Sequence, residues 1–208
     1  MTEDEFIKQK IAGFSWYQTI QFKEGIKSVG CEWCGDPAWE NIRKLLPDSL
    51  EGKRVLDLGS NAGIFCVRSA LMGAECVGIE SDEWKKDTDY LKQAEFVKDY
   101  FEKDKKRSLP IRYLEGRIED IIEQDLGHFD YCYGIACLYY LKEPEKVMKR
   151  LTDISDNIIM RLRDINQIEL FTGLAEKNGF FLKGCMREEW WTKLGRVTDD
   201  FYLYHYGR

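Results

Sequence analysis

Short apolar segments that alternate with longer segments of helical spacing constrain the fold of this chain more than any other feature. The apolar segments, each short enough for one strand, are residues 54–58, 75–80, 111–114, 129–136 and 157–162. The apolar spacing of the segments that follow them predicts helices at 63–72, 84–103, 118–124, 143–151 and 168–177. Parallel strands need a crossover between them, and that crossover is usually a helix. The alternation therefore predicts an α/β fold built on a mostly parallel sheet.

Both ends of the chain depart from this alternation. Asn178-Gly179 predicts the end of the last helix, because glycine readily adopts the left-handed conformation that often follows a helix. Residues 180–186 and 201–206 then look like two strands without a crossover helix, which predicts an antiparallel C-terminal strand pair and a seven-stranded sheet. Residues 1–50 are rich in aromatic side chains and predict a helical N-terminal cap. We expect a single domain over residues 1–208, with a cap or lid at 1–50 and the core at 51–208.

The composition limits the partners and the compartment that can be expected. A net charge of -6 and a pI near 5.2 disfavour nucleic acid, although they do not exclude a local basic patch. The first ten residues are largely polar and charged and resemble neither a signal peptide nor a transit peptide, and no apolar run approaches about 20 residues. We expect a cytoplasmic protein with no membrane span, whose seven cysteines are reduced. The sequence leaves the oligomeric state open.

The segment after the first predicted strand carries the strongest functional signal. The strand ends at residue 58, and the loop Gly-Ser-Asn-Ala-Gly follows at 59–63 before the next helix begins. In open α/β sheets, ligands bind beyond the carboxyl ends of the strands, where glycines let a ligand approach the backbone. Gly59 and Gly63 fit that role. Glu80 ends the second strand 23 positions after Asp57, near the spacing at which a carboxylate binds ribose hydroxyls. The ligand therefore looks like a nucleoside.

The details of this loop narrow the class of nucleoside. The loop lacks the second glycine of the dinucleotide fingerprint, and the chain lacks the Gly-Lys-Ser or Gly-Lys-Thr of a phosphate-binding P-loop. An adenosine that carries an amino acid fits instead. With an acid before the first glycine, the segment resembles motif I of the class I S-adenosylmethionine-dependent methyltransferases, and Glu80 matches the ribose-binding acid of their second strand.

This resemblance implies a Rossmann-like fold, with a seven-stranded, mostly parallel sheet and helices on both faces, and S-adenosylmethionine as the cofactor. In this family the loop backbone from Gly59 to Gly63 would hold the methionine end, and Asp57 would order the loop or reach the amino group. Contacts to adenine would follow the third strand, and donor and acceptor would meet beside the end of the fourth. The cofactor-binding residues that the resemblance implies are Asp57, Gly59, Ser60, Asn61, Gly63, Glu80, Ser81, Arg117, Ile118 and Gly134.

A narrower resemblance extends into the N-terminal part of the chain. Residues 16–20 (Trp-Tyr-Gln-Thr-Ile), 50–57 (Leu-Glu-Gly-Lys-Arg-Val-Leu-Asp) and 138–141 (Leu-Tyr-Tyr-Leu) are similar to the branch that contains the tRNA wobble-uridine carboxymethyltransferases. That branch commonly has Tyr-His where this chain has Tyr139-Tyr140, and its tRNA enzymes carry a longer N-terminal region with more basic surface. The resemblance implies an RNA-modifying methyl- or carboxymethyltransferase as an alternative function, and a carboxylated donor as an alternative to the ordinary one.

Methyl transfer from a sulfonium mainly requires orientation of donor and acceptor, with a base where the acceptor is a hydroxyl. The catalytic candidates are Tyr139, Tyr140 and Arg161. The tyrosines follow the fourth strand and would shape the acceptor pocket, unless one of them packs in the core. Arg161, with Arg163, closes the fifth strand and would clamp an anionic acceptor, unless it pairs with a nearby surface acid.

Several other residues have a functional and a structural interpretation. Trp16 and Tyr17 would form a lid over the site or belong to the core of the cap. His128 and His205 are expected to be structural. Residues 31–34 (Cys-Glu-Trp-Cys) have the spacing of half a zinc site or of a redox pair, and with no second pair in the sequence we expect no metal.

Together these observations predict a methyltransferase that uses S-adenosylmethionine and methylates a small polar or anionic acceptor, at oxygen rather than at carbon or nitrogen. The wobble-uridine type of tRNA modification is one alternative, and a non-catalytic scaffold that keeps the methyltransferase fold is another.

Overall fold

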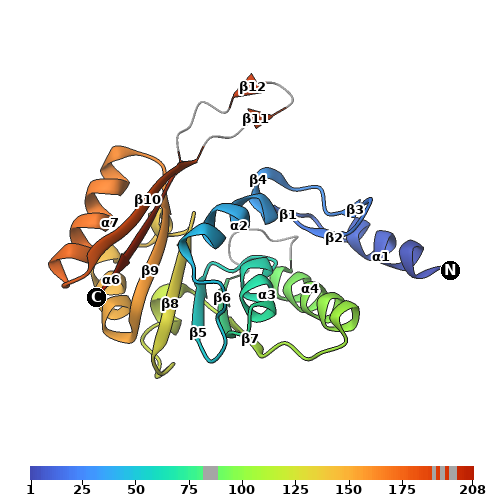
Figure 1. Ribbon diagram of the computed structural model, residues 1–208, viewed down its shortest axis with the longest axis horizontal. Coiled ribbons are helices and arrows are strands. Elements are labelled where there is room, and N and C mark those ends of the chain that lie inside the picture. Colours follow the sequence, from blue (N-terminus) through green and yellow to red (C-terminus); the bar gives the residue numbers. More distant parts are fainter. Residues whose placement is uncertain (82–88, 189–190, 193–194, 197–200) are drawn as a thin grey trace.

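A computed structural model describes residues 1–81, 89–188, 191–192, 195–196 and 201–208 (Figure 1). Seven strands form one sheet in the order β10-β13-β9-β8-β5-β6-β7. Their bounds are β5 Arg54–Leu58, β6 Glu75–Glu80, β7 Ile111–Glu115, β8 Phe129–Ile135, β9 Ser155–Leu162, β10 Phe181–Glu188 and β13 Phe201–Gly207. Strands β5 to β9 pair in parallel, whereas β13 lies between β9 and β10 and is antiparallel to both. The predicted seven-stranded, mostly parallel sheet is therefore confirmed.

Helices cover both faces of the sheet, as predicted. Figure 1 shows α3 and α4 side by side on one side of the sheet and α6 and α7 together on the other. The helix bounds are α3 Ile64–Leu71, α4 Tyr90–Lys105, α5 Ile118–Ile121, α6 Pro144–Ile154 and α7 Ile165–Lys177. The helix predicted at 84–103 includes residues 84–88, which lie outside the described residues, and α5 is shorter than the predicted 118–124. At the end of α7 the chain turns at Gly179, whose φ is +81°, as the Asn-Gly pair predicted.

The alternation of side chains along β5 explains the two layers of core. Val55 belongs to the apolar cluster under α3 and α4, whereas Leu56 and Leu58 belong to the cluster under α6 and α7. Successive residues of a strand point to opposite faces, so a central strand with helices on both faces must be apolar on both. Asp57 is the exception, because it is an acidic residue that is nevertheless fully buried in this strand.

The N-terminal segment contains strands as well as the expected helices. Its elements are α1 Glu3–Ala12, β1 Gln18–Thr19, β2 Gln21–Lys23, β3 Ile26–Lys27, β4 Cys31–Gly35, α2 Asp36–Ile42 and the 3-10 turn η1 Arg43–Leu45. Strands of two to five residues are too short to show a clear alternation in the sequence. Ile20, Phe22 and Trp39 are buried in the same cluster as Val55, which fixes this segment on the α3 and α4 side of the sheet.

Three small elements complete the described chain. The 3-10 turn η3, Leu138–Tyr140, follows β8, and the short strands β11, Trp191–Thr192, and β12, Gly195–Arg196, form an antiparallel pair. None of the helices in the described part of the chain combines the length and the apolar character that a membrane span requires.

Gly63 joins β5 to α3 at a place where a side chain would not fit. Its φ is +72°, and a Cβ at this position would lie 2.7 Å from Cζ of Tyr113 and overlap the hydroxyl of that residue. Gly52 has a similar φ of +70° but has no heavy atom within 4 Å of the corresponding position. Both positions therefore require a residue that tolerates positive φ, but only Gly63 must also lack a side chain to leave room for Tyr113.

We predict that Gly52→Ala costs about 1–2 kcal/mol of unfolding free energy, because alanine is strained at positive φ. Gly63→Ala should cost about 1–3 kcal/mol more, because Tyr113 must also move. Urea unfolding followed by circular dichroism measures both values. Equal losses in the two variants would contradict the packing role of Gly63.

Candidate active site

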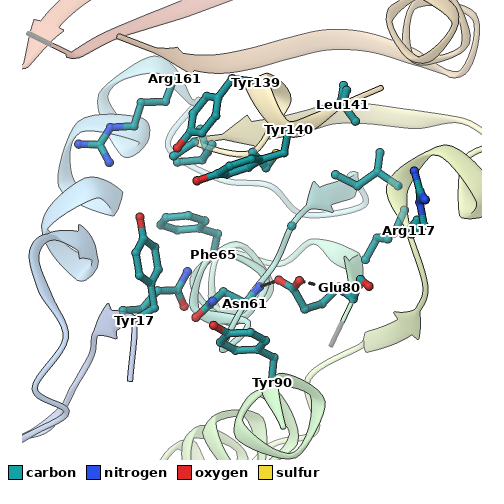
Figure 2. A pocket seen from close by; sticks show the side chains of 18 of the residues that line it. Tyr17, Asn61, Phe65, Glu80, Tyr90, Arg117, Tyr139, Tyr140, Leu141 and Arg161 are labelled. Carbon is teal, nitrogen blue, oxygen red and sulfur yellow. Dashed lines mark hydrogen bonds between the residues drawn. The ribbon is translucent and has the colours of Figure 1, made fainter. Parts of the chain in front are cut away.

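A pocket with a volume of about 480 Å³ lies beyond the carboxyl ends of the central strands, between the sheet and the N-terminal segment (Figure 2). We call one part of its lining the glycine-loop end, formed by Gly59, Asn61, Ile79, Glu80, Ser81, Gly116, Arg117, Ile118 and Glu119. The other part, the tyrosine end, is formed by Tyr17, Gln18, Cys34, Gly35, Ala38, Phe65, Tyr139, Tyr140 and Arg161. Ile135, Ala136, Cys137, Leu141, Lys142 and Tyr90 complete the wall.

The loop after β5 reverses direction through left-handed backbone conformations. Gly59, Asn61 and Gly63 have φ values of +64°, +52° and +72°. Glycine adopts this region freely, and asparagine is among the residues that tolerate it. The amide of Gly63 donates to the carbonyl of Ser60 at 2.8 Å and closes the turn.

Glu80 holds this loop against the end of β6. Its Oε2 accepts a hydrogen bond from the Asn61 amide at 2.6 Å, and its Oε1 accepts one from the Ser81 amide at 2.8 Å (Figure 2). Hydrogen bonds to a carboxylate are about twice as strong as neutral ones. The carboxylate is therefore fixed at the pocket wall with both oxygens oriented by backbone amides.

Polar atoms beside the loop fit a polar ligand in this pocket. Among the described residues, Oδ1 of Asn61 and Oγ of Ser60 are buried and have no hydrogen-bond partner. A buried polar atom without a partner is costly, and such atoms are rare in folded proteins. Asn61 lines the pocket, so the groups present there suit a ligand that supplies a hydrogen-bond donor.

Asp57 lies behind the loop and does not line the pocket. Its carboxyl is fully buried, and its Oδ2 accepts a weak hydrogen bond from the Cys66 thiol at 3.7 Å. Burial raises the pKa of Asp57 to about 8, and the nearby charge of Glu80 acts in the same direction. Among the described residues, the other oxygen, Oδ1, is buried without a hydrogen-bond partner, and the expected role of Asp57 in ordering the loop stays a prediction.

Three more of the expected cofactor-binding residues also lie outside the lining, namely Ser60, Gly63 and Gly134. The two glycines make room for side chains that the sequence analysis did not consider. Tyr113 fills the space at Gly63, and a Cβ at Gly134 would lie 2.9 Å from the side chain of Leu138. Gly59 does line the pocket, but a Cβ there would also lie 2.9 Å from Cβ of Cys137. Packing therefore requires these glycines independently of any ligand.

Arg117 and Ile118 lie at the glycine-loop end, as expected. A guanidinium nitrogen of Arg117 lies 3.6 Å from a carboxylate oxygen of Glu119, and that oxygen also accepts the Lys142 amide at 2.9 Å. Glu119 therefore connects the segment after β7 to the segment after η3. Ile79 and Ile118 add apolar surface to this end of the pocket.

Tyr139 and Tyr140 shape the tyrosine end together. Their ring centroids are 4.4 Å apart, and the guanidinium of Arg163 lies 5.0 Å from the Tyr139 ring centroid. Tyr140 is 54% exposed, so it forms the rim of the pocket rather than part of the core. Burial raises the pKa of Tyr139, and this hydroxyl therefore remains protonated at neutral pH.

Arg161 is buried at the tyrosine end and does not pair with the surface acids near it in sequence. Its Nε donates to Glu188 at 2.6 Å, and its guanidinium lies 4.2 Å from the Phe201 ring centroid. Asn41 donates to the other oxygen of Glu188 at 3.0 Å. Sequence spacing could not predict this pairing. The two residues are 27 positions apart, and β13 lies between the strands that carry them.

The N-terminal segment adds the side chains of Tyr17 and Cys34 to this end. The sequence did not predict that they lie together. Cys34 contacts the Cys31 thiol, the Tyr17 hydroxyl and the Arg161 guanidinium. The hydrogen bond with Cys31 lowers the pKa of Cys34 to about 7, with Tyr17 and Arg161 acting in the same direction and burial opposing them. Tyr17 thus belongs to the pocket, whereas Trp16 packs against the core and its Nε1 donates to the Ile11 carbonyl at 2.8 Å.

The two histidines lie away from the pocket lining, and their structural roles stay a prediction. His128 lies 3.0 Å from Asp156 at the start of β8, and His205 in β13 hydrogen-bonds to Asn157 at 3.0 Å. Within the described ranges, no group of three or more His, Cys, Asp and Glu side chains could hold a metal ion. All seven cysteines are free thiols.

Comparison with known proteins places this geometry in a family. The model of the methyltransferase domain family matches residues 29–172. A tRNA U34 carboxymethyltransferase of Alcanivorax borkumensis is 30% identical over 142 residues, which are 68% of this chain and 40% of that protein. A ubiquinone biosynthesis O-methyltransferase of Maricaulis maris is 30% identical over 94 residues, 45% of this chain and 33% of that protein. The chain thus spans less than half the length of these relatives.

Solved structures share the fold. The N-terminal domain of EvdMO1 with S-adenosylhomocysteine bound has a TM-score of 0.67 at 17% identity, with 100% of this chain and 97% of that chain covered. A precorrin-6y C5,15-methyltransferase of Geobacter metallireducens has a TM-score of 0.61 at 10% identity, with 82% and 85% covered. The family match covers more than half of the chain, and the chain belongs to the S-adenosylmethionine-dependent methyltransferases.

Proposed function

We propose that this methyltransferase transfers a methyl or carboxymethyl group to a uridine-type base of tRNA, with the tyrosine end of the pocket as the acceptor site. The observation that carries the proposal is the pair Tyr139 and Tyr140, which lies beside the glycine-loop end, and the 30% identity over 142 residues to a tRNA U34 carboxymethyltransferase supports it. Enzymes that modify a base take it out of its stack, and they commonly hold it against aromatic side chains.

The glycine-loop end is the proposed site of the donor. Glu80 is oriented by two backbone amides, and carboxylate oxygens accept more than one hydrogen bond each, so it can also accept from the hydroxyls of a ribose. Asn61 would contact the methionine end, and Ile79, Ile118 and Arg117 would surround the adenine. S-adenosylmethionine, when bound, supplies an electrophilic methyl group on a sulfonium.

The tyrosine end suits a planar acceptor with negative charge nearby. Tyr17 and Tyr140 present exposed aromatic surface, and Figure 2 shows that the labelled tyrosines point into the same cavity. Lys142 lines the pocket, and Arg163 lies over the Tyr139 ring, so two cations lie near this end. Cations at this place would attract phosphates although the chain as a whole is acidic.

The contribution of the chain to the reaction would be orientation. Displacement at a sulfonium needs donor and acceptor in line, and a correctly oriented pair gains a large part of the rate. The protonated Tyr139 can donate a hydrogen bond to an acceptor oxygen, and the buried Phe65 provides an apolar wall beside it.

A small anionic acceptor that is methylated at oxygen is the second candidate. Arg161 favours it, because a buried cation at the inner wall of the pocket suits a carboxylate or phenolate. The net charge of -6 points in the same direction, as does the similarity to a ubiquinone biosynthesis O-methyltransferase.

Labelled methyl donor distinguishes the two candidates. The protein is incubated with methyl-labelled S-adenosylmethionine and either unfractionated tRNA or a panel of small phenols and hydroxy acids. Label that becomes sensitive to ribonuclease supports the tRNA proposal. Label only in the small acceptors would reject it in favour of the second candidate. A parallel reaction with a carboxylated donor tests which group is transferred.

For the donor site, we predict that Glu80→Gln weakens binding of S-adenosylhomocysteine by about 10- to 100-fold. The NH2 group of the glutamine would face the N–H of Asn61 or Ser81, and one carboxylate oxygen that accepts hydrogen bonds would be lost. Glu115, the exposed neighbour of Glu80 in the β6–β7 register, is the matched control. Glu115→Gln should change the dissociation constant by less than about twofold, since its charge lies outside the pocket. Calorimetric titration measures both, after thermal melting has verified that each variant is folded.

For the acceptor site, we predict that Tyr140→Ala lowers kcat/KM for tRNA by about 5- to 100-fold, because stacking on an aromatic ring contributes about 1–3 kcal/mol per base. Tyr140→Phe keeps the ring and should retain nearly full activity. The same loss in both variants would show that the hydroxyl, rather than the ring, is needed. Binding of S-adenosylhomocysteine should stay unchanged in both variants.

A further inference from the structure

The segment that carries Cys31 and Cys34 is fixed against β1 at both ends. A Cβ at Gly30 would lie 2.6 Å from the Tyr17 and Gln18 carbonyl oxygens, and one at Gly35, whose φ is +79°, would overlap the Thr19 carbonyl oxygen. The Cys31 amide donates to the Tyr17 carbonyl at 2.8 Å, and the Thr19 hydroxyl donates to the Cys31 carbonyl at 2.9 Å. Close backbone contact therefore holds this segment on the strand that follows Tyr17.

The register of this pairing brings the two thiols together. Gln18 pairs with Cys31, but its neighbour Thr19 pairs with Gly35, so the residues between Cys31 and Gly35 have no partner of their own in β1. In a regular strand, positions 31 and 34 would face opposite sides. The bulge removes this alternation and lets the two thiols approach each other, and each affects the pKa of the other.

The cysteines differ in their surroundings. Cys34 is 5% exposed, lines the pocket and contacts the Tyr17 hydroxyl and the Arg161 guanidinium. Cys31 is not part of the pocket lining, and the interaction with Cys34, together with burial, raises the pKa of the Cys31 thiol. A thiolate stabilised by donors beside a protonated thiol is the usual arrangement of a reactive Cys-x-x-Cys pair.

We propose that Cys31 and Cys34 form an oxidation site at the tyrosine end of the pocket, where a small peroxide entering the cavity converts the pair to a disulfide and thereby disables the acceptor site. The oxidation chemistry does not depend on the proposed function. Its effect on group transfer rests on that function, and the experiments below separate the two.

The chemistry balances with hydrogen peroxide as the oxidant. The Cys34 thiolate attacks one peroxide oxygen, the O–O bond breaks, and hydroxide leaves and takes up a proton to become water. The sulfenic acid at Cys34 is then attacked by the Cys31 sulfur as it loses its proton. The S–S bond forms, and the S–O bond breaks with release of a second water. In total, two thiols and one peroxide give one disulfide and two waters.

The disulfide would change the tyrosine end and leave the glycine-loop end intact. A disulfide sulfur is neutral, so it no longer accepts charge-assisted hydrogen bonds from Tyr17 and Arg161. Arg161 keeps Glu188 but loses a partner inside the pocket, and Tyr17 is released from its position. At that end, Glu80 holds the Asn61 and Ser81 amides, and Gly59 packs against Cys137.

Mass spectrometry tests the oxidation directly. Trypsin cuts after Lys27 and Arg43, and the peptide between them contains Cys31 and Cys34 but no other cysteine. After one equivalent of hydrogen peroxide and then a thiol-alkylating reagent, this peptide should be lighter by two hydrogens and carry no label, and dithiothreitol should restore two labelled thiols. Two labelled thiols after peroxide, with Cys185 oxidised instead, would overturn the proposal, because Cys185 is the exposed thiol in β10.

Variants test the roles of the individual groups. In Cys31→Ser, a sulfenic acid at Cys34 should accumulate and be trapped by dimedone, whereas Cys34→Ser should yield neither product. Tyr17→Phe removes one donor to Cys34 and should slow disulfide formation by about 3- to 10-fold, as expected for the loss of one hydrogen bond of about 1 kcal/mol. Cys185→Ser is the matched control and should react like the unmodified protein. An unchanged rate in Tyr17→Phe would contradict activation by the pocket.

Binding and transfer assays on the oxidised protein test the consequence. Binding of S-adenosylhomocysteine should change by less than about twofold, while group transfer should fall by about tenfold or more and recover with dithiothreitol. Transfer that stays unchanged while the disulfide forms would overturn the regulatory part. If neither the reduced nor the oxidised protein binds S-adenosylhomocysteine, the donor assignment fails, whereas the peptide masses still decide the oxidation site.

Discussion

The two hydrogen bonds that the Glu80 carboxylate accepts from the Asn61 and Ser81 amides are the interaction on which the pocket depends. They fasten the loop after β5 to the end of β6, and the loop can follow this path only because Gly59, Asn61 and Gly63 tolerate positive φ. With the loop in this position, Cys137 packs at Gly59 and Tyr113 packs at Gly63, so one turn is in contact with segments after β8 and within β7. The same carboxylate that would bind a ribose therefore also holds the wall of its own site.

The sheet and the glycine-loop end could be predicted from the sequence because their signals are local. Each core strand is a short apolar run, and the loop, the acid of β6 and the segment after β7 each follow directly from such a run. The local pattern could not indicate which glycines are required because a neighbouring side chain packs against them. Gly63 faces Tyr113 of β7, a contact that arises only once distant segments lie in one sheet. Gly134 faces Leu138, which the 3-10 turn after β8 brings back onto the strand.

The tyrosine end was harder to predict because its residues come from four distant parts of the chain. Tyr17 precedes a strand of two residues and Cys34 lies in one of five, both too short for a periodic signal. Arg161 reaches Glu188 across β13, which lies between their strands. A cation in an apolar stretch is a weak indication of such a buried pair, because it has to find a partner inside the protein. Sequence spacing pointed to surface acids beside Arg161, whereas the partner lies 27 positions away.

These two kinds of construction imply different tolerances to change. The glycine-loop end is made from consecutive turns that are also part of the core, so a substitution there disturbs packing and ligand binding together. The tyrosine end is made from a bulged N-terminal segment and the ends of β8 and β9. Its polar network consists of Cys34, Tyr17, Arg161 and Glu188. Of these four described residues, only Arg161 belongs to a parallel strand of the sheet. The proposed acceptor site could therefore vary, or respond to oxidation, while the proposed donor site and the fold remain constant. The constraint on this variation is Glu188, since a buried carboxylate without Arg161 would be strongly destabilising.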